Sequence, residues 1–262
     1  MGPFIKQLKF NFKRLYLRNR GYQIGTLLMP VAFYALFTKI MVKGSGPEMM
    51  MYSKTYIASM VIYSVLINAL FGVAQFLQED RRVQLVQNME MTPAGTSSYY
   101  LSISVLMAGA NLVSAILIQL VAILENGVDL TAVMVIETAV LAVLGTLPIM
   151  LVGIAYSYLK SPELLGALSN VTVFPLAMVS GLWWPISIMP KWLRQIGELT
   201  PTYISKHILD SQLLNKSISH NDMMGLIVWL LITGAVVGLA VIRDKGGLRF
   251  DVQQTTKTEK NI

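Results

Sequence analysis

Long apolar runs separated by short polar segments dominate the chain. Six runs are long enough for a helix that crosses a hydrocarbon layer of about 30 Å, which needs about 20 residues. The pattern therefore predicts an all-α, polytopic membrane protein with six transmembrane helices in one transmembrane domain over residues 1–262. The predicted spans are roughly 22–42, 55–78, 99–124, 132–158, 164–186 and 222–242. Pro148 is expected to kink the fourth span, because proline cannot donate the backbone hydrogen bond of a regular helix.

The first 20 residues are amphipathic rather than uniformly apolar. Apolar side chains recur at helical spacing among six cations, which is typical of a helix lying in the plane of the membrane surface. The apolar positions are Phe4, Ile5, Leu8, Phe12 and Leu15. We expect an interfacial helix over residues 1–20. The apolar run behind it is too long for the core of a cleaved signal peptide, so we expect it to remain as an anchor.

Lysine and arginine are distributed unequally around the six spans. With the N-terminus in the cytoplasm, the cytoplasmic side holds 14 of the 21 cations and the outside holds 7. Six of the 14 precede the first span, two lie in the link after the second, one follows the fourth and five lie in the tail. Cations concentrate on the cytoplasmic side of membrane proteins, so both termini are predicted to be cytoplasmic, with a tail at 246–262. The same rule accounts for the net charge of +7, and no nucleic acid partner is expected.

Composition narrows the chemistry that the chain can perform. Charged residues make up only 13% of it, against about 25% in a typical soluble domain. Cysteine is absent, and His207 and His220 are the two histidines, which leaves few ligands for a metal. No phosphate-binding loop of the form GxxxxGK[ST], no HExxH motif and no plausible Ser/His/Asp set occurs. We expect no metal site, no cofactor bound by this chain and no enzymatic activity of its own.

The link between the second and third spans, residues 79–98, carries the strongest functional signal. Glu79 and Asp80 would suit the positive N-terminal end of a short amphipathic helix, and Pro93 would stop it. The apolar positions of that helix would be Val83, Val86, Met89 and Met91. A helix lying across the cytoplasmic ends of two spans would act as a lever for a soluble partner. On the pattern alone, a plain solvated loop fits equally well.

The fifth apolar run ends in the unusual stretch GLWWPISIMPKWL, which begins at Gly181. Tryptophan prefers the boundary between hydrocarbon and water, and the prolines end one helical piece and start another. We expect short external helices over 185–221 that re-enter the outer leaflet and cap a translocation path. The alternative is an external lid without a gating role. The candidate gate residues are Gly181, Trp183, Trp184, Pro185, Met189, Pro190 and Trp192.

Four polar residues fall within the predicted spans and are candidates for a substrate path. Asn111 and Gln119 lie in the third span, Glu137 near the start of the fourth, and Asn170 in the fifth. Hydrogen bonds between helices are the more common use of such amides. The Glu137 carboxylate is close enough to the end of its span to reach toward the outside instead.

Both motifs resemble those of the ABC type-2 permease family. The family's cytoplasmic coupling region follows the pattern Glu-Arg-Glu-x-Gly-Thr, then leucines, then Thr-Pro. Matching positions here are Asp80, Arg81, Thr92 and Pro93, and the chain departs from the pattern at Arg82, Gln84 and Leu85. The external stretch resembles the family pattern Ser-Gly-x-x-x-Pro-x-x-x-Met-Pro-x-Trp-Leu, which is met from Ser180 to Leu193 and followed by Pro201 and Tyr203.

The resemblance implies the membrane subunit of an ATP-driven exporter in the plasma membrane of a bacterium. Separate ABC ATPase subunits would hold ATP and Mg, and six spans are half of the usual complement, so a second permease copy or a similar permease is expected. The implied cargo is a drug, an antimicrobial peptide or a lipid-like molecule, which would link the chain to antibiotic resistance. An ion-coupled secondary transporter and a non-transporting membrane scaffold are the alternatives. The implied ATPase-coupling residues are Glu79, Asp80, Arg81, Arg82, Met89, Thr92 and Pro93.

Overall fold

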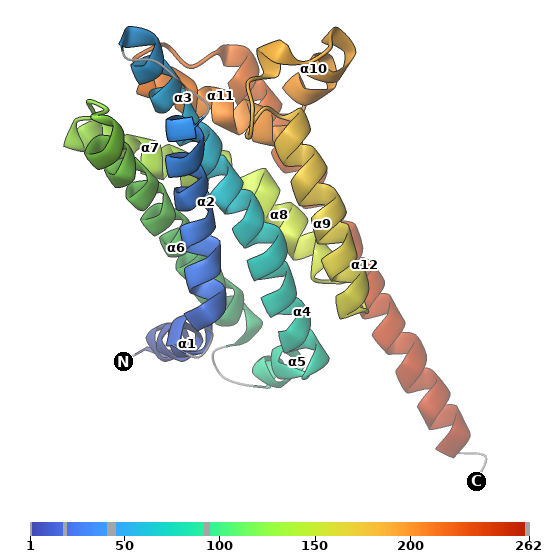
Figure 1. Cartoon of the computed structure of the whole chain (residues 1–262). Coiled ribbons are helices and arrows are strands. Elements are labelled where there is room, and N and C mark those ends of the chain that lie inside the picture. The colour runs from blue at the N-terminus through green and yellow to red at the C-terminus, as the bar shows by residue number, and fades with distance from the viewer. Residues whose placement is uncertain (1, 18–19, 41–45, 92–94, 260–262) are drawn as a thin grey trace.

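The computed structural model describes residues 2–17, 20–40, 46–91 and 95–259, and no β-strand occurs in these ranges (Figure 1). The regular helices pack into one bundle, and three short segments depart from α-helical geometry. Two of these are π-helical, η1 (Lys13–Leu17) and η2 (Asn68–Val73), and the third is the 3-10 turn η3 (Ile186–Ile188). The α-helices are α1 (Pro3–Phe12), α2 (Arg20–Ile40), α3 (Pro47–Ile67), α4 (Ala74–Arg82), α5 (Leu85–Glu90), α6 (Gly95–Asn126), α7 (Ala132–Gly145), α8 (Leu147–Tyr156), α9 (Pro162–Val179), α10 (Lys191–Glu198), α11 (Pro201–Leu213) and α12 (His220–Glu259).

Most of the predicted spans coincide with long apolar helices. Four helical stretches of the described chain are long and apolar enough to cross a membrane, and α7 with α8 makes a fifth if the bent pair is one span. The four are Pro47–Arg82, Thr96–Asn126, Pro162–Val179 and His220–Asp244. The prediction of an all-helical, multi-pass membrane protein is confirmed. In α2 the apolar helical segment is the shorter Leu27–Ile40, so a sixth span there stays a prediction.

Several boundaries differ from the predicted ones. The second span begins earlier than expected, at Pro47, which is well suited to the first turn of a helix because its missing N–H would have no partner there. The fifth ends earlier, at Val179, and Gly181 follows with a left-handed φ of +74°. The sixth is longer, since α12 continues through most of the predicted tail to Glu259.

The predicted kink in the fourth span is confirmed. The axes of α7 and α8 are bent by 42° at a break that contains Thr146, and Pro148 lies in the first turn of α8. The Thr146 hydroxyl donates to the Ala142 carbonyl oxygen at 2.5 Å, which satisfies a backbone group at the end of α7. A local rule, the missing N–H of proline, therefore accounts for the main bend of the bundle.

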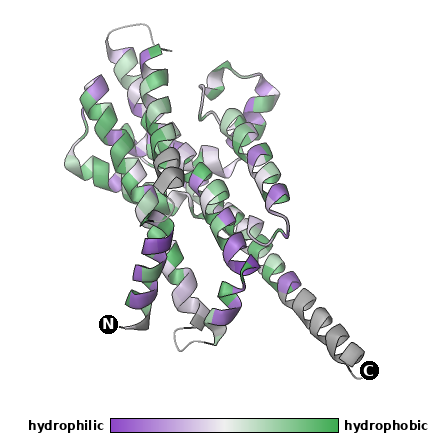
Figure 2. Cartoon of the chain, turned by 60° about the horizontal axis from the view of Figure 1, so that its bottom comes forward, coloured by the Kyte–Doolittle hydropathy of each residue, from purple (hydrophilic) through white to green (hydrophobic). Residues whose placement is uncertain are grey.

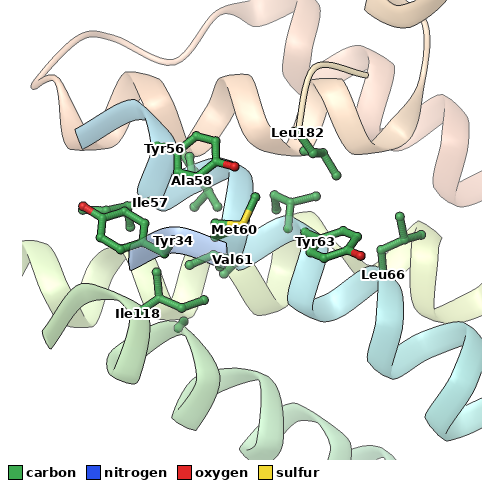
Figure 3. Close-up of a cluster of buried hydrophobic side chains, with 14 of the residues drawn as sticks. Tyr34, Tyr56, Ile57, Ala58, Met60, Val61, Tyr63, Leu66, Ile118 and Leu182 are labelled. Carbon is green, nitrogen blue, oxygen red and sulfur yellow. The ribbon is translucent and has the colours of Figure 1, made fainter. Parts of the chain in front are cut away.

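The long helix that contains α3 lies at the centre of the bundle. Every residue from Tyr56 to Leu70 is buried, and α3 contacts α2, α6, α8, α9 and α11 (Figure 3). Hydroxyl and amide groups on this helix form hydrogen bonds with neighbouring helices. Ser64 and Ser114 of α6 share a hydrogen bond at 2.5 Å, and Asn68 Nδ2 donates to Asn111 Oδ1 at 2.7 Å.

A π-helical turn, η2, joins α3 to α4 without ending the helix. The wider turn offers backbone carbonyls to other helices. Ser169 of α9 donates to the Leu70 carbonyl oxygen at 3.0 Å. On the other side, the backbone of Gly153 lies so close to the Ala69 carbonyl that a Cβ on Gly153 would stand 2.2 Å from that oxygen. Glycine at 153 is therefore what allows α8 to pack against this turn.

The two ends of the bundle carry different elements. Helices α1 and α5 lie at one end together with the far end of α12, and α10 and α11 lie at the opposite end (Figure 1). Helix α1 carries both hydrophilic and hydrophobic residues, as its amphipathic pattern predicted (Figure 2). We call these the α5 end and the α10 end. The start of the described chain and the end of α12 lie at the same end of the bundle, which is compatible with the predicted six crossings (Figure 1). That this end faces the cytoplasm stays a prediction.

Replacing Gly153 by alanine should destabilise the protein by about 1–3 kcal/mol, the usual cost of forcing extra atoms into a packed contact. Heating the detergent-purified protein and measuring the monodisperse fraction by size exclusion would report the loss. Gly166→Ala is the matched control, because a Cβ there meets nothing within 4 Å. A similar loss of thermal stability in both variants would contradict the proposed contact.

Candidate functional site

The predicted coupling region is built differently from the expectation. Residues 79–82 form the C-terminal end of the long central helix, and the chain reverses at Val83 and Gln84 before α5 begins. The prediction that Glu79 and Asp80 begin a separate helix is wrong, because nothing between η2 and Arg82 interrupts the helix of the span. Two of the implied coupling residues, Thr92 and Pro93, lie outside the described residues.

Gln84 occupies the position where the family pattern has glycine. Its φ is +57°, in the left-handed region that glycine adopts without a steric penalty and that costs other residues about 1–2 kcal/mol. The geometry of the reversal therefore explains why glycine suits this position. The departure from the pattern at Gln84 leaves the turn in place.

Asp80 is fully buried at the α5 end and holds three elements together. Its carboxylate accepts both Nη atoms of Arg14, one of them at 3.1 Å, and the hydroxyl of Tyr99 at 2.5 Å. The Arg14 guanidinium also lies over the rings of Phe10 and Phe76, 5.5 and 4.9 Å from their centroids. A bidentate pair with a third donor satisfies most of the carboxylate's lone pairs, as a buried charge requires. Asp80 thus ties η1, α4 and α6 together.

Two further hydrogen bonds fasten the N-terminal segment to α6. Asn11 Nδ2 donates to Ser102 Oγ at 2.6 Å, and the Tyr16 hydroxyl donates to the Leu106 carbonyl oxygen at 2.7 Å. Burial raises the pKa of the Tyr16 hydroxyl to about 12, so it remains a donor at any physiological pH. The amphipathic segment is therefore packed into the bundle at the α5 end. A location at the membrane surface stays a prediction.

Arg81 faces inward on the neighbouring side of the helix. Its Nη1 donates to Ser157 Oγ and its Nη2 to the Tyr100 hydroxyl at 3.3 Å, and its guanidinium lies 3.5 Å from the centroid of the Tyr158 ring. Burial raises the pKa of Tyr158, although Arg81 opposes part of the rise, so the ring below the guanidinium is neutral. Within the described part of the chain, no carboxylate forms an ion pair with Arg81.

Other residues of the reversal face outward. Glu79 and Arg82 form an exposed ion pair with an N–O distance of 2.8 Å. The side chains of Val83 and Met91 are 54% and 87% exposed, which is unusual for apolar residues at a polar end of the bundle. Met89, by contrast, is half-buried and packs in the small core formed by α4, α5 and α6. We call Glu79, Arg82, Val83 and Met91 the turn face.

An apolar cavity of about 240 Å³ lies near Arg81, between η2 and α4 on one side and α6, α7, α8 and α12 on the other. Two of its lining residues connect it to Arg81. The Tyr100 hydroxyl accepts a hydrogen bond from Arg81, and the Ile154 carbonyl oxygen accepts one from Ser157, which itself accepts from Arg81. The lining residues are Val73, Leu77, Tyr100, Ile103, Ser104, Met107, Ala108, Asn111, Val143, Leu147, Met150, Leu151, Ile154 and Leu230.

The structure does not bring the four candidate path residues together. Asn111 lines the cavity. Gln119 is buried and donates to the carbonyl oxygens of Ala115 and Val135 at 3.2 and 3.3 Å, which fastens α6 to α7. The remaining two lie at the surface of the chain: Asn170 donates to the Gly166 carbonyl oxygen of its own helix, and Glu137 accepts from Gln212 of α11 at 2.5 Å.

At the α10 end, the tryptophans of the predicted gate separate into two environments. The ring of Trp183 packs among aromatic rings of three helices, at centroid distances of 6.4 Å to Phe33, 5.7 Å to Tyr63 and 5.9 Å to Phe174. Trp184 is half-buried beside it, with the two ring centroids 6.1 Å apart. Trp192 on α10 is 63% exposed.

The rest of the predicted gate forms the connection to α10. Gly181 makes the turn after α9, and Pro185, Met189 and Pro190 flank η3. Gly197 lets α10 approach the end of α9, since a Cβ there would lie 2.1 Å from the Val179 carbonyl oxygen. Helix α11 then packs against α3 and α7 at this end, whereas entry of α10 and α11 into the membrane stays a prediction.

Removing the Asp80 carboxylate should cost about 3–5 kcal/mol, the range for breaking one partner of a buried ion pair. Asp80→Ala would leave the Arg14 guanidinium uncompensated, and the thermal stability of the purified protein measures the loss. Adding Arg14→Met should recover part of it, because the unpaired charge is then gone. Glu79→Ala is the matched control, since its exposed pair contributes little. If Glu79→Ala destabilised the protein as much as Asp80→Ala, the assigned role of Asp80 would be wrong.

The amino-acid sequence is similar to known membrane transport proteins. The family model described as ABC-2 type transporter matches residues 6–213, which includes the turn face and the stretch from Ser180 to Leu193. The chain is also 25% identical over 203 residues to a Bacillus subtilis (strain 168) protein named Putative transport permease YvfS, a match that covers 78% of this chain and 82% of that protein. The family match covers well over half of the chain. The chain therefore belongs to the ABC-2 type transporter family, as a membrane permease.

Proposed function

We propose that the chain is the membrane half of an ATP-driven exporter, worked by separate ABC ATPase subunits that hold ATP and Mg. Membership of the ABC-2 family implies a context with ATPase partners. The observation that carries the proposal is the position of the turn face at the end of one continuous helix of 36 residues. That helix runs through the centre of the bundle, so a force applied at the turn face acts directly on the core.

The turn face is the docking site in this proposal. An exposed ion pair flanked by two exposed apolar side chains offers both charge and apolar area to a partner. Asp80, Arg81 and Met89 point away from that surface, so they would act by holding the turn in place. Because Asp80 joins α4 to η1 and α6, these three elements would move together when the ATPases close.

The second permease, the orientation in the membrane, the cargo and the outer gate are proposed by analogy with the ABC-2 family. A second permease, identical or similar, would complete the translocation path, and the α5 end with both termini would face the cytoplasm of a bacterium. A hydrophobic or amphipathic cargo suits the apolar cavity and would leave toward the α10 end. The external elements from Gly181 to Trp192 would act as the outer gate.

Charging the turn face should weaken ATPase docking. In the double variant Val83→Asp, Met91→Asp, two desolvated carboxylates would oppose binding, and we expect co-purification of the ATPase subunits to fall at least ten-fold, a change of about 1.4 kcal/mol. Ile188→Asp is the control, because Ile188 is an exposed apolar residue at the α10 end. Unchanged recovery of the ATPases with the double variant would refute the docking site.

The outer gate can be tested without knowing the cargo. The chain has no cysteine, so Ser187→Cys introduces a single label site in η3. In the complex with its ATPases, ATP should change the rate of maleimide labelling several-fold. Trp183→Ala should abolish the ATP dependence, because the Trp183 ring connects η3 to α2, α3 and α9. Trp192→Ala, which removes an exposed ring, serves as the control; a labelling rate that never responds to ATP would argue for a passive lid.

A further inference from the structure

We propose that the cavity beside Arg81 binds an anionic, single-chain amphiphile, with its acid group at Arg81 and its apolar chain between α6 and α8. The inference deepens the proposed function by naming the chemical class of cargo. It rests on the proposed function only for export, because binding requires no ATPase. The shared chemistry is a carboxylate or phosphate on one hydrocarbon chain, supplied either by a free fatty acid or by a lipid of the bilayer.

The cavity has the size and lining for a hydrocarbon chain. Its volume of about 240 Å³ exceeds the roughly 150 Å³ of an apolar cavity that holds a benzene molecule. At the deep end, Asn111 already accepts from Asn68 and donates to Met150 Sδ at 3.8 Å. Both the oxygen and the nitrogen of the Asn111 amide therefore keep a partner when an apolar molecule fills the cavity. This removes the main cost of filling the cavity with hydrocarbon, which is an unsatisfied buried polar group.

The cavity is elongated. Its lining residues on α6 run from Tyr100 to Asn111, a separation of eleven positions that corresponds to about 16 Å along a helix axis. Three other lining residues, Ser104, Leu147 and Leu230, have exposed side chains. All three lie in helices of the membrane-spanning part, so the cavity opens sideways at membrane depth. A long, narrow, laterally open cavity suits a chain that enters from the bilayer better than it suits a compact ring system.

Arg81 supplies the charge that selects an anion. Unlike Arg14 and Arg82, which pair with Asp80 and Glu79, it forms no ion pair with a carboxylate of the described residues, and its hydrogen-bond partners there are neutral hydroxyls. Its guanidinium carries five N–H donors, and two donate to Ser157 and Tyr100. The remaining donors suit a carboxylate or phosphate, which pairs with arginine more strongly than a neutral group does. Tyr100, whose hydroxyl accepts from Arg81, also lines the cavity, so head group and chain would occupy neighbouring parts of one site.

The test uses photoactivatable lauric acid, with a diazirine at the end of its chain, added to the protein in lipid nanodiscs without ATPase subunits. We expect cross-links on peptides of α6 and α8 that contain Met107 and Met150. Arg81→Gln should lower this labelling about ten-fold, the effect of losing a charge-assisted hydrogen bond of about 1.4 kcal/mol. Arg82→Gln is the matched control, because that neighbouring cation lies on the turn face, and it should leave the labelling unchanged.

Two further arms make the outcome decisive. Ser104→Phe places a ring at the lateral opening and should block labelling while Arg81 remains, with size exclusion confirming that each variant is folded. The matching diazirine alcohol, which lacks the charge, should label the cavity at least ten-fold less. A photoactivatable anionic lysophospholipid, which has one hydrocarbon chain, identifies the source: stronger labelling by it than by the fatty acid assigns the site to a single-chain lipid of the bilayer, and the reverse assigns it to a free acid.

Equal labelling by acid and alcohol, or equal labelling of the Arg81→Gln variant and the unaltered protein, would overturn the proposal. So would cross-links confined to residues outside the cavity. Because ATPase docking is measured separately through the turn face, loss of amphiphile binding and loss of the proposed coupling can be told apart.

Discussion

The complete enclosure of the central helix is the constraint on which the rest of the structure depends. From Tyr56 to Leu70 every side chain is buried, so the polar groups on this helix need hydrogen-bond partners within the protein. Ser64 meets Ser114, Asn68 meets Asn111, and the widened π-helical turn receives the hydroxyl of Ser169. These bonds determine how α6 and α9 sit against the centre. Gly153 adds a steric condition, because only glycine lets α8 approach the same turn.

A second constraint acts where this helix reaches the α5 end. Asp80 cannot reach water, and its charge is balanced by Arg14 with a third contact from Tyr99. Such a pair adds little net stability over an apolar packing, but it is costly to break, so it specifies one arrangement of η1, α4 and α6. The N-terminal segment, the central helix and the reversal into α5 thereby form one mechanical unit. In the proposed exporter, this unit carries the motion from the turn face, and Arg81 beside it offers a charge to the cavity.

Only part of the candidate site could be predicted from the sequence. Chemistry at 79–82 indicated a charged functional segment, and the family resemblance pointed to the same residues. The sequence did not indicate that Glu79 and Arg82 face outward while Asp80 and Arg81 face inward. Which of four adjacent charged residues is buried depends on how the helix is rotated against α6, and the sequence does not specify that rotation. Arg14 was indistinguishable from the other cations of an amphipathic helix, and no local signal marked Tyr99, Ser157 or Tyr158 as partners.

The sequence by itself determined the features that depend on local chemistry. Apolar runs of membrane-spanning length predicted helices, the missing N–H of Pro148 predicted a bend, and the spacing of apolar residues in the first segment predicted an amphipathic helix. Tertiary structure alone decided which long helix lies at the centre, that the helix continues to Arg82 before it reverses, and that four polar residues of the spans serve separate contacts. Those outcomes depend on how distant helices meet. Whether a given side chain is buried depends on the packing of the whole bundle. The free energy gained or lost by burying it therefore cannot be read from the residues next to it in the sequence.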